Sequence, residues 1–134
     1  MTHPRTAIRA ALLDRLRTVE GLKRVEVGPP PSDPRDRPCA GIVDLGETRE
    51  GSDYGLTERI ATFGVMLVAS DADEADVTDA LDALELALDA ALDEPLDRPC
   101  EGIAVVGTSP ELDPDGGLVS GVRRVTVQAV YRTR

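Results

Sequence analysis

An eleven-residue phrase occurs twice in this chain of 134 residues, and it limits what the chain can fold into. DRPCAGIVDLG begins at Asp36 and DRPCEGIAVVG begins at Asp97, and the two copies agree at seven of the eleven positions. Because proline has no amide donor, it is tolerated where a strand begins but not inside a central strand. Pro38 and Pro99 each precede an apolar run. Each copy of the phrase therefore predicts the start of a β-strand.

The same order of elements surrounds both copies. Apolar residues at helical spacing predict a helix from about Pro4 to Glu20 before the first copy, and a helix that ends near Leu92 before the second. Ser70 and Asp71 are the expected caps of this second helix. After each copy, a polar connection that contains glycine leads to a long strand, TERIATFGVMLVA or VRRVTVQAVYR. We therefore expect two αββ units, which either an internal duplication or a coincidence between similar templates would explain.

The expected fold class is α+β, with residues 1–134 forming a single domain. It has a mixed or antiparallel sheet of about five strands and two main helices, and LKRVEVG supplies an extra short strand. The long strand is apolar on both faces from Ile60 onward, as is typical of a central strand. SPELDPDGG is predicted as a turn. The last strand, Val122–Arg132, alternates apolar and polar residues, so we expect it to have one polar face and a free edge.

The N-terminal region and the apolar runs bear on where the chain is made. No apolar run approaches the length of about 18 residues that a membrane-spanning helix needs. The first residues carry Asp14 within an apolar stretch and have no small-residue cleavage site, which argues against a secretory signal. We expect synthesis in the cytosol and no membrane partner.

The residues that usually carry chemistry are few. The chain has two cysteines, Cys39 and Cys100, and one histidine, His3, whereas a structural zinc site generally needs four nitrogen or sulfur ligands. Two structural thiols are favoured over a disulfide between equivalent strand starts. LDPDGG resembles the start of a calcium loop but lacks the spaced ligands and the closing Glu, and no phosphate-binding glycine motif occurs. We expect no metal, no cofactor and no enzymatic activity.

The net charge of −10 is concentrated in one segment. Between Asp71 and Asp97 there are eleven acidic residues and no basic ones, which gives −11, so the remaining 14 acids and 15 bases give +1. Most of these acids lie in the second predicted helix. The candidates for its outward face are Asp79, Asp82, Glu85 and Asp89.

Three interpretations of this acidic face are open. It is a solvated surface, a subunit interface neutralised by arginines of another copy, or a wall that repels passing DNA. For the interface, the candidate arginines are Arg9 and Arg17 of the first helix and Arg124 of the last strand. Direct nucleic-acid binding is disfavoured, because phosphate contacts need clustered Lys or Arg and stacking needs aromatic residues.

The order of elements resembles that of the tail terminator proteins of long-tailed phages, the group that contains the lambda minor tail protein U. A proline-rich segment precedes a strand in PPPSDPRDRPCAGIVDLG. A long strand runs directly into a helix in ATFGVMLVASDADEADVTDALDALELAL, and a closing strand ends near an aromatic residue in VTVQAVYRTR. The resemblance covers almost the whole chain and rests on element order and length. The acidic helix and the repeated phrase depart from the family pattern.

The resemblance implies a structural role in a virion. Proteins of this family form a ring, usually of six copies, on the end of the tail tube. The ring stops polymerisation of the tube and joins the head-completion or neck proteins, and DNA later passes through it. The chain is then expected at the tail–neck junction of a virion that is assembled in the host cytoplasm.

Two other functions compete with this one. A neck or head-completion protein of the same virion would share size and symmetry with a tail terminator. A small cytosolic ligand-binding regulatory module of ferredoxin-like type would also contain two αββ units. GETREGSDYG is the candidate for its ligand loop.

Overall fold

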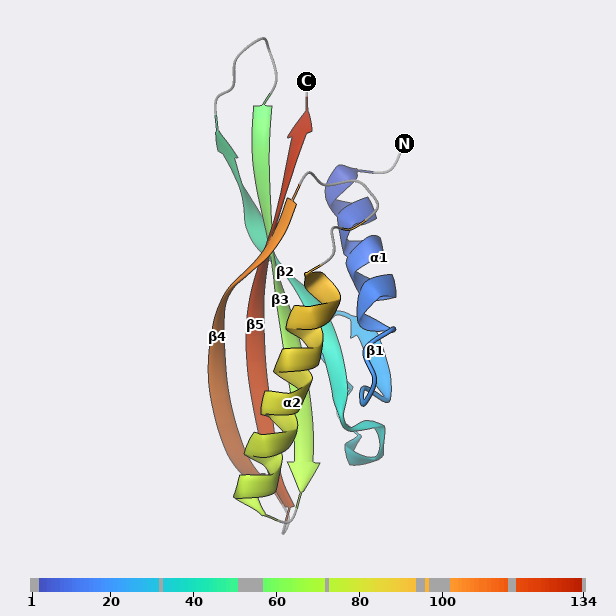
Figure 1. The fold of residues 1–134 in the computed structure, drawn as a ribbon, viewed down its shortest axis with the longest axis vertical. Coiled ribbons are helices and arrows are strands. Elements are labelled where there is room, and N and C mark those ends of the chain that lie inside the picture. Colours follow the sequence, from blue (N-terminus) through green and yellow to red (C-terminus); the bar gives the residue numbers. More distant parts are fainter. Residues whose placement is uncertain are drawn as a thin grey trace.

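A computed structural model describes residues 3–31, 33–50, 57–71, 73–93, 96, 102–115 and 118–133. The chain forms two α-helices and five strands of one mixed sheet, which confirms the predicted fold class (Figure 1). The elements are α1 (Pro4–Leu16), β1 (Arg24–Val27), β2 (Cys39–Glu50), β3 (Thr57–Asp71), α2 (Glu74–Leu92), β4 (Gly102–Asp115) and β5 (Leu118–Thr133). A short 3-10 turn, Pro34–Asp36, precedes β2.

The strand order in the sheet is β1-β2-β3-β5-β4. β1 pairs with β2 in parallel, and every other pair is antiparallel. Two hairpins, β2–β3 and β4–β5, are therefore joined side by side through β3 and β5, and β1 is the predicted extra strand. Both helices lie on the same face of the sheet (Figure 1).

The two copies of the repeated phrase occupy equivalent places in the hairpins. The closing glycine of the first copy, Gly46, follows a register shift in β2 and pairs with Thr62. The closing glycine of the second copy, Gly107, follows a register shift in β4 and pairs with Thr126. Such a shift accommodates one extra residue as a β-bulge. The matching positions agree with two αββ units, although residues 97–101 of the second copy lie outside the described part of the chain.

The core lies between the helices and the sheet. Alternate residues of β3 and β5 point towards the helices, so one face of each strand is buried while the other is more exposed. The apolar side chains that these two strands contribute to this core are Ala61, Phe63, Val65, Leu67, Ala69, Val125, Val127, Ala129 and Tyr131. The helices contribute Ile8, Leu12, Leu16, Val77, Leu81, Leu84, Leu88 and Leu92. The predicted polar face of β5 is confirmed, because Arg124 is exposed on the opposite side.

The helix boundaries differ from the predicted ones for local reasons. α1 ends at Leu16 rather than Glu20, because the Thr18 hydroxyl and amide both donate to the Arg15 carbonyl, at 2.6 and 3.1 Å, and so tighten the last turn. Ser70 and Asp71 do not cap α2, because β3 continues through both of them. Asp73 is the cap instead, and its carboxylate accepts a hydrogen bond from the Ala75 amide at 2.9 Å.

The strands are longer than predicted, and β5 is not an edge. β2 continues to Glu50, and β4 continues to Asp115 through the segment that was predicted as a turn. Pro110 and Pro114 fit within β4 because an edge strand has amides that need no ladder partner. The expectation of a free edge on the last strand is wrong, since β5 lies between β3 and β4. The edges of the sheet are β1 and β4.

Candidate interaction surfaces

One side of α2 faces away from the sheet and carries much of the chain's negative charge. We call it the α2 outer face, and its exposed residues are Asp79, Asp82, Ala83, Leu86, Asp89 and Ala90. Leu86 is 71% exposed, more than any other large apolar side chain in the described residues. Near the start of the helix, repulsion from Asp71, Asp73 and Asp79 raises the pKa of Asp76. The negative charges around the start of α2 therefore act on one another.

Two of the four predicted acidic candidates have a partner within their own chain. Arg123 of β5 is only 8% exposed and lies beneath α2. Its guanidinium forms ion pairs with Asp82 and, at 3.5 Å, with Glu85. No ion pair is found for Asp79 or Asp89 within the described part of the chain, so these two carry the charge that is open to a partner.

The structure separates the three candidate arginines. Arg9 is half-buried on α1, and Arg17 is the exposed C-cap of the same helix. Arg124 is exposed on the face of the sheet opposite the helices. Its neighbour Arg123 was missed as the partner of the acidic helix. Side chains alternate between the two faces of β5, so Arg123 lies on the same face as the buried Val125. This alternation could have identified Arg123 as the partner.

A second arginine also supports α2. Arg15 of α1 donates a hydrogen bond from Nη1 to the Ala91 carbonyl at 2.7 Å. The last turn of α2 has no basic residue of its own. A cation is favourable beside the carbonyl end of a helix. Arg15 of α1 therefore supplies the positive charge that the last turn of α2 does not have.

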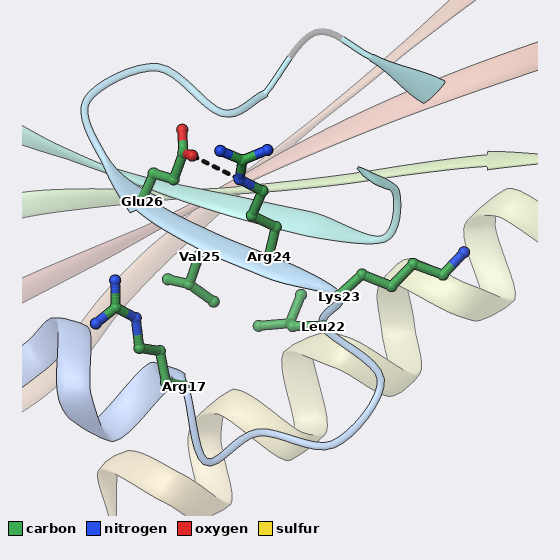
Figure 2. A pocket seen from close by; sticks show the side chains of 6 residues that line it. All are labelled: Arg17, Leu22, Lys23, Arg24, Val25 and Glu26. Atoms are coloured by element: carbon green, nitrogen blue, oxygen red, sulfur yellow. Dashed lines mark ion pairs between the residues drawn. The ribbon is translucent and has the colours of Figure 1, made fainter. Parts of the chain in front are cut away.

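A basic hollow lies where the chain passes from the end of α1 into the edge strand β1 (Figure 2). It is lined by Arg17, Leu22, Lys23, Arg24, Val25 and Glu26. Figure 2 shows Leu22 and Val25 between Arg17 and Lys23, with Arg24 and Glu26 on the other side of the strand. Arg24 pairs with Glu26 at 2.6 Å. Within the described residues, Arg17 and Lys23 form no ion pair, so their charges remain available.

A third polar group joins β2, β3 and β5 near one end of the sheet. The side chain of Glu47 is 7% exposed and accepts hydrogen bonds from the Tyr131 hydroxyl and, at 3.2 Å, from Arg59. Burial raises the pKa of Glu47, but the bonds from Tyr131 and Arg59 lower it more, so the net pKa is below the ordinary carboxyl value. The network holds the β2–β3 hairpin against β5.

This network predicts a stability that falls in acid. Because the folded pKa of Glu47 is depressed, its contribution is complete above the ordinary Glu pKa of about 4.3 and is lost as the pH falls through the folded value. Glu47→Gln should cost about 1.5–3 kcal/mol near neutral pH, the usual worth of hydrogen bonds to a charged group. Urea unfolding at several pH values should show the two proteins converging in acid. A constant difference would contradict this role.

The described residues provide no metal centre. No group of three or more His, Cys, Asp or Glu among them is placed to hold a metal ion. Cys39 is a buried free thiol whose Sγ lies 3.8 Å from the Pro31 carbonyl oxygen, and burial raises its pKa. Cys100 lies outside the described residues. No helix in the described ranges has the length and apolar character to cross a membrane.

Comparison with known proteins shows a likeness in fold. The sequence matches no protein-family model and no curated protein. Among solved structures, the fold is similar to that of a chain in the virion of a native gene transfer agent particle, with a TM-score of 0.63 and 18% sequence identity. The match covers 97% of this chain and 98% of that chain. The likeness therefore shows a shared fold over the full length of both chains.

Proposed function

We propose that this chain is a structural protein of a tailed, phage-like particle, and that it acts there as the tail terminator. The observation that carries the proposal is the full-length fold similarity to a chain of a gene transfer agent virion. The match covers 97% of this chain and 98% of that chain, so it involves the whole arrangement of helices and strands. The element order that resembles tail terminators supports the finer assignment.

The surfaces of the molecule suit a ring. The acidic α2 outer face lies over β3 and β5, whereas the basic hollow lies beside β1 at the edge of the sheet. Contacts between two different surfaces generate closed rings when their rotation closes. In the proposed role, a ring of six copies sits on the end of the tail tube. It contacts the tube protein on one side and the neck or head-completion protein on the other, with DNA as passing cargo.

The two competing functions have different support. A neck or head-completion protein of the same particle would also fit the virion fold, and the experiment below separates it from a terminator. A ligand-binding module depends on the segment GETREGSDYG. Its residues 46–50 are part of β2, and its next residues, 51–55, lie outside the described part. No specific observation favours that module or an enzyme.

Removing the chain from a particle-producing cell tests the proposal. Without a terminator, tail tubes should grow to variable lengths and should not join heads, and electron microscopy of the lysate measures both properties. Tails of normal length that fail to join heads would instead assign the chain to the neck or to head completion. Normal particles would refute both virion roles.

A further inference from the structure

We propose that the α2 outer face of one copy docks into the basic hollow of a second copy. The inference deepens the proposed function, because it names the subunit contact of the ring and rests on that ring. The occupant of the hollow is therefore an acidic helix with a central leucine, supplied by an identical chain.

The charges on the two surfaces are complementary and available. Asp79 and Asp89 are exposed and form no ion pair among the described residues, and the same holds for Arg17 and Lys23 of the hollow. Ten residues of α-helix separate the two aspartates, about 15 Å along the axis. Asp82 and Glu85 are held by Arg123. Each copy therefore presents one acidic and one basic surface that its own fold leaves unneutralised.

The apolar groups on the two surfaces are also matched. Leu86 is 71% exposed and lies between the acidic residues of α2. In the hollow, Leu22 is half-buried between the two basic side chains (Figure 2). On α2 an apolar side chain protrudes among charges, and in the hollow an apolar floor is surrounded by charges. Protein–protein interfaces have this arrangement of an apolar centre with a polar rim. Leu86 then serves as the anchor, and the charges fix its orientation.

The contact joins two different surfaces and is therefore head-to-tail. α2 packs on β3 and β5, and the hollow lies beside β1 at one edge of the sheet. A copy can therefore use its α2 outer face with one neighbour and its hollow with another at the same time. Such a contact propagates from copy to copy and ends only when a ring closes.

Charge reversal tests the contact, because it can be repaired. The acid-reversed variant is Asp79→Arg with Asp89→Arg, and the base-reversed variant is Arg17→Glu with Lys23→Glu. Each variant alone brings like charges together and should weaken self-association by at least about tenfold. In a mixture, each reversed surface meets its complement, so rings should form again with the two variants in alternation. Native mass spectrometry and sedimentation measure both the size and the composition of these rings.

Three further variants sharpen the result. Leu86→Gln should also weaken association at least about tenfold, since it removes the apolar anchor. Asp14→Arg and Arg49→Glu reverse exposed charges elsewhere and should leave association unchanged. Thermal melting should show all variants folded, because the reversals spare the residues that hold Arg123.

The outcomes separate this contact from the proposed function. Assembly of both reversed variants at wild-type affinity, or mixtures that show no recovery, would overturn the docking of α2 into the hollow while leaving a terminator ring with another interface. A wild-type chain that stays monomeric at its highest soluble concentration would also overturn it. The proposed function is tested independently by tail length and head joining.

Discussion

Gly41→Ala should unfold the protein or lower its melting temperature by about 10 °C or more, a cost of about 3 kcal/mol or above. A Cβ at this position would lie 2.4 Å from the Gly28 carbonyl oxygen and 2.6 Å from the Pro30 amide nitrogen. Both of these are backbone atoms, so no flexible side chain can move aside. The proline-rich loop would have to leave β2, and it would uncover the buried Cys39. Thermal melting followed by circular dichroism measures the effect.

Gly64→Ala is the matched control. Its Cβ would lie 3.2 Å from Leu45 Cδ1 and 3.4 Å from Arg124 Cδ, and both of these atoms belong to flexible side chains. This change should cost less than about 1 kcal/mol, because the two side chains can turn away. Equal melting temperatures for the two variants would contradict the close packing of the loop on β2. Both copies of the repeated phrase contain a glycine at the position of Gly41. In the first copy, the proline-rich loop packs so closely on Gly41 that no side chain fits there.

Removing both carboxylates beside Arg123 should have the second largest effect. Asp82→Asn with Glu85→Gln leaves a guanidinium that is 8% exposed without its two counter-charges. Breaking a buried ion pair costs about 3–5 kcal/mol. Because the Asp82 side chain is 58% exposed and water screens it, we expect about 2 kcal/mol in urea unfolding.

Two controls distinguish this effect from a general change of charge. Asp79→Asn with Asp89→Asn removes the same number of charges from exposed positions, and it should change stability by no more than about 0.5 kcal/mol. Adding Arg123→Met to the variant with Asp82→Asn and Glu85→Gln replaces the uncompensated cation with an apolar side chain. This third change should recover most of the lost stability. If the variant at Asp82 and Glu85 and the variant at Asp79 and Asp89 lost equal stability, Arg123 would not be the cause of the loss.

The sequence predicted the fold well where the pattern was local. Helical spacing located α1 and α2, and the repeated phrase predicted the starts of two strands, of which β2 does begin at Cys39. The ends of elements were predicted less well, because they depend on contacts from distant parts of the chain. Ser70 looked like a helix cap, yet its hydroxyl lies 3.0 Å from that of Ser120, its partner in β5. Likewise, β4 extends through two prolines only because it is an edge strand.

The surfaces were only partly predictable. The acidic character of α2 and the exposure of Asp79 and Asp89 followed from composition and spacing. The pairing of Asp82 and Glu85 with Arg123 depends on how α2 crosses β5, which no local pattern specifies. The basic hollow joins the end of α1 to β1, and its residues became a unit only when the chain was folded. Whether any of these residues contact another subunit stays a prediction.

The most direct measurement of the terminator assignment is the position and copy number of this chain in intact particles. Electron cryomicroscopy of tails should show a closed ring of this fold at one end of the tube, next to the neck, with six copies in the proposed arrangement. The full-length similarity to a virion chain makes the fold recognisable in such a map. A single copy per tail, or copies spread along the length of the tube, would contradict the assignment.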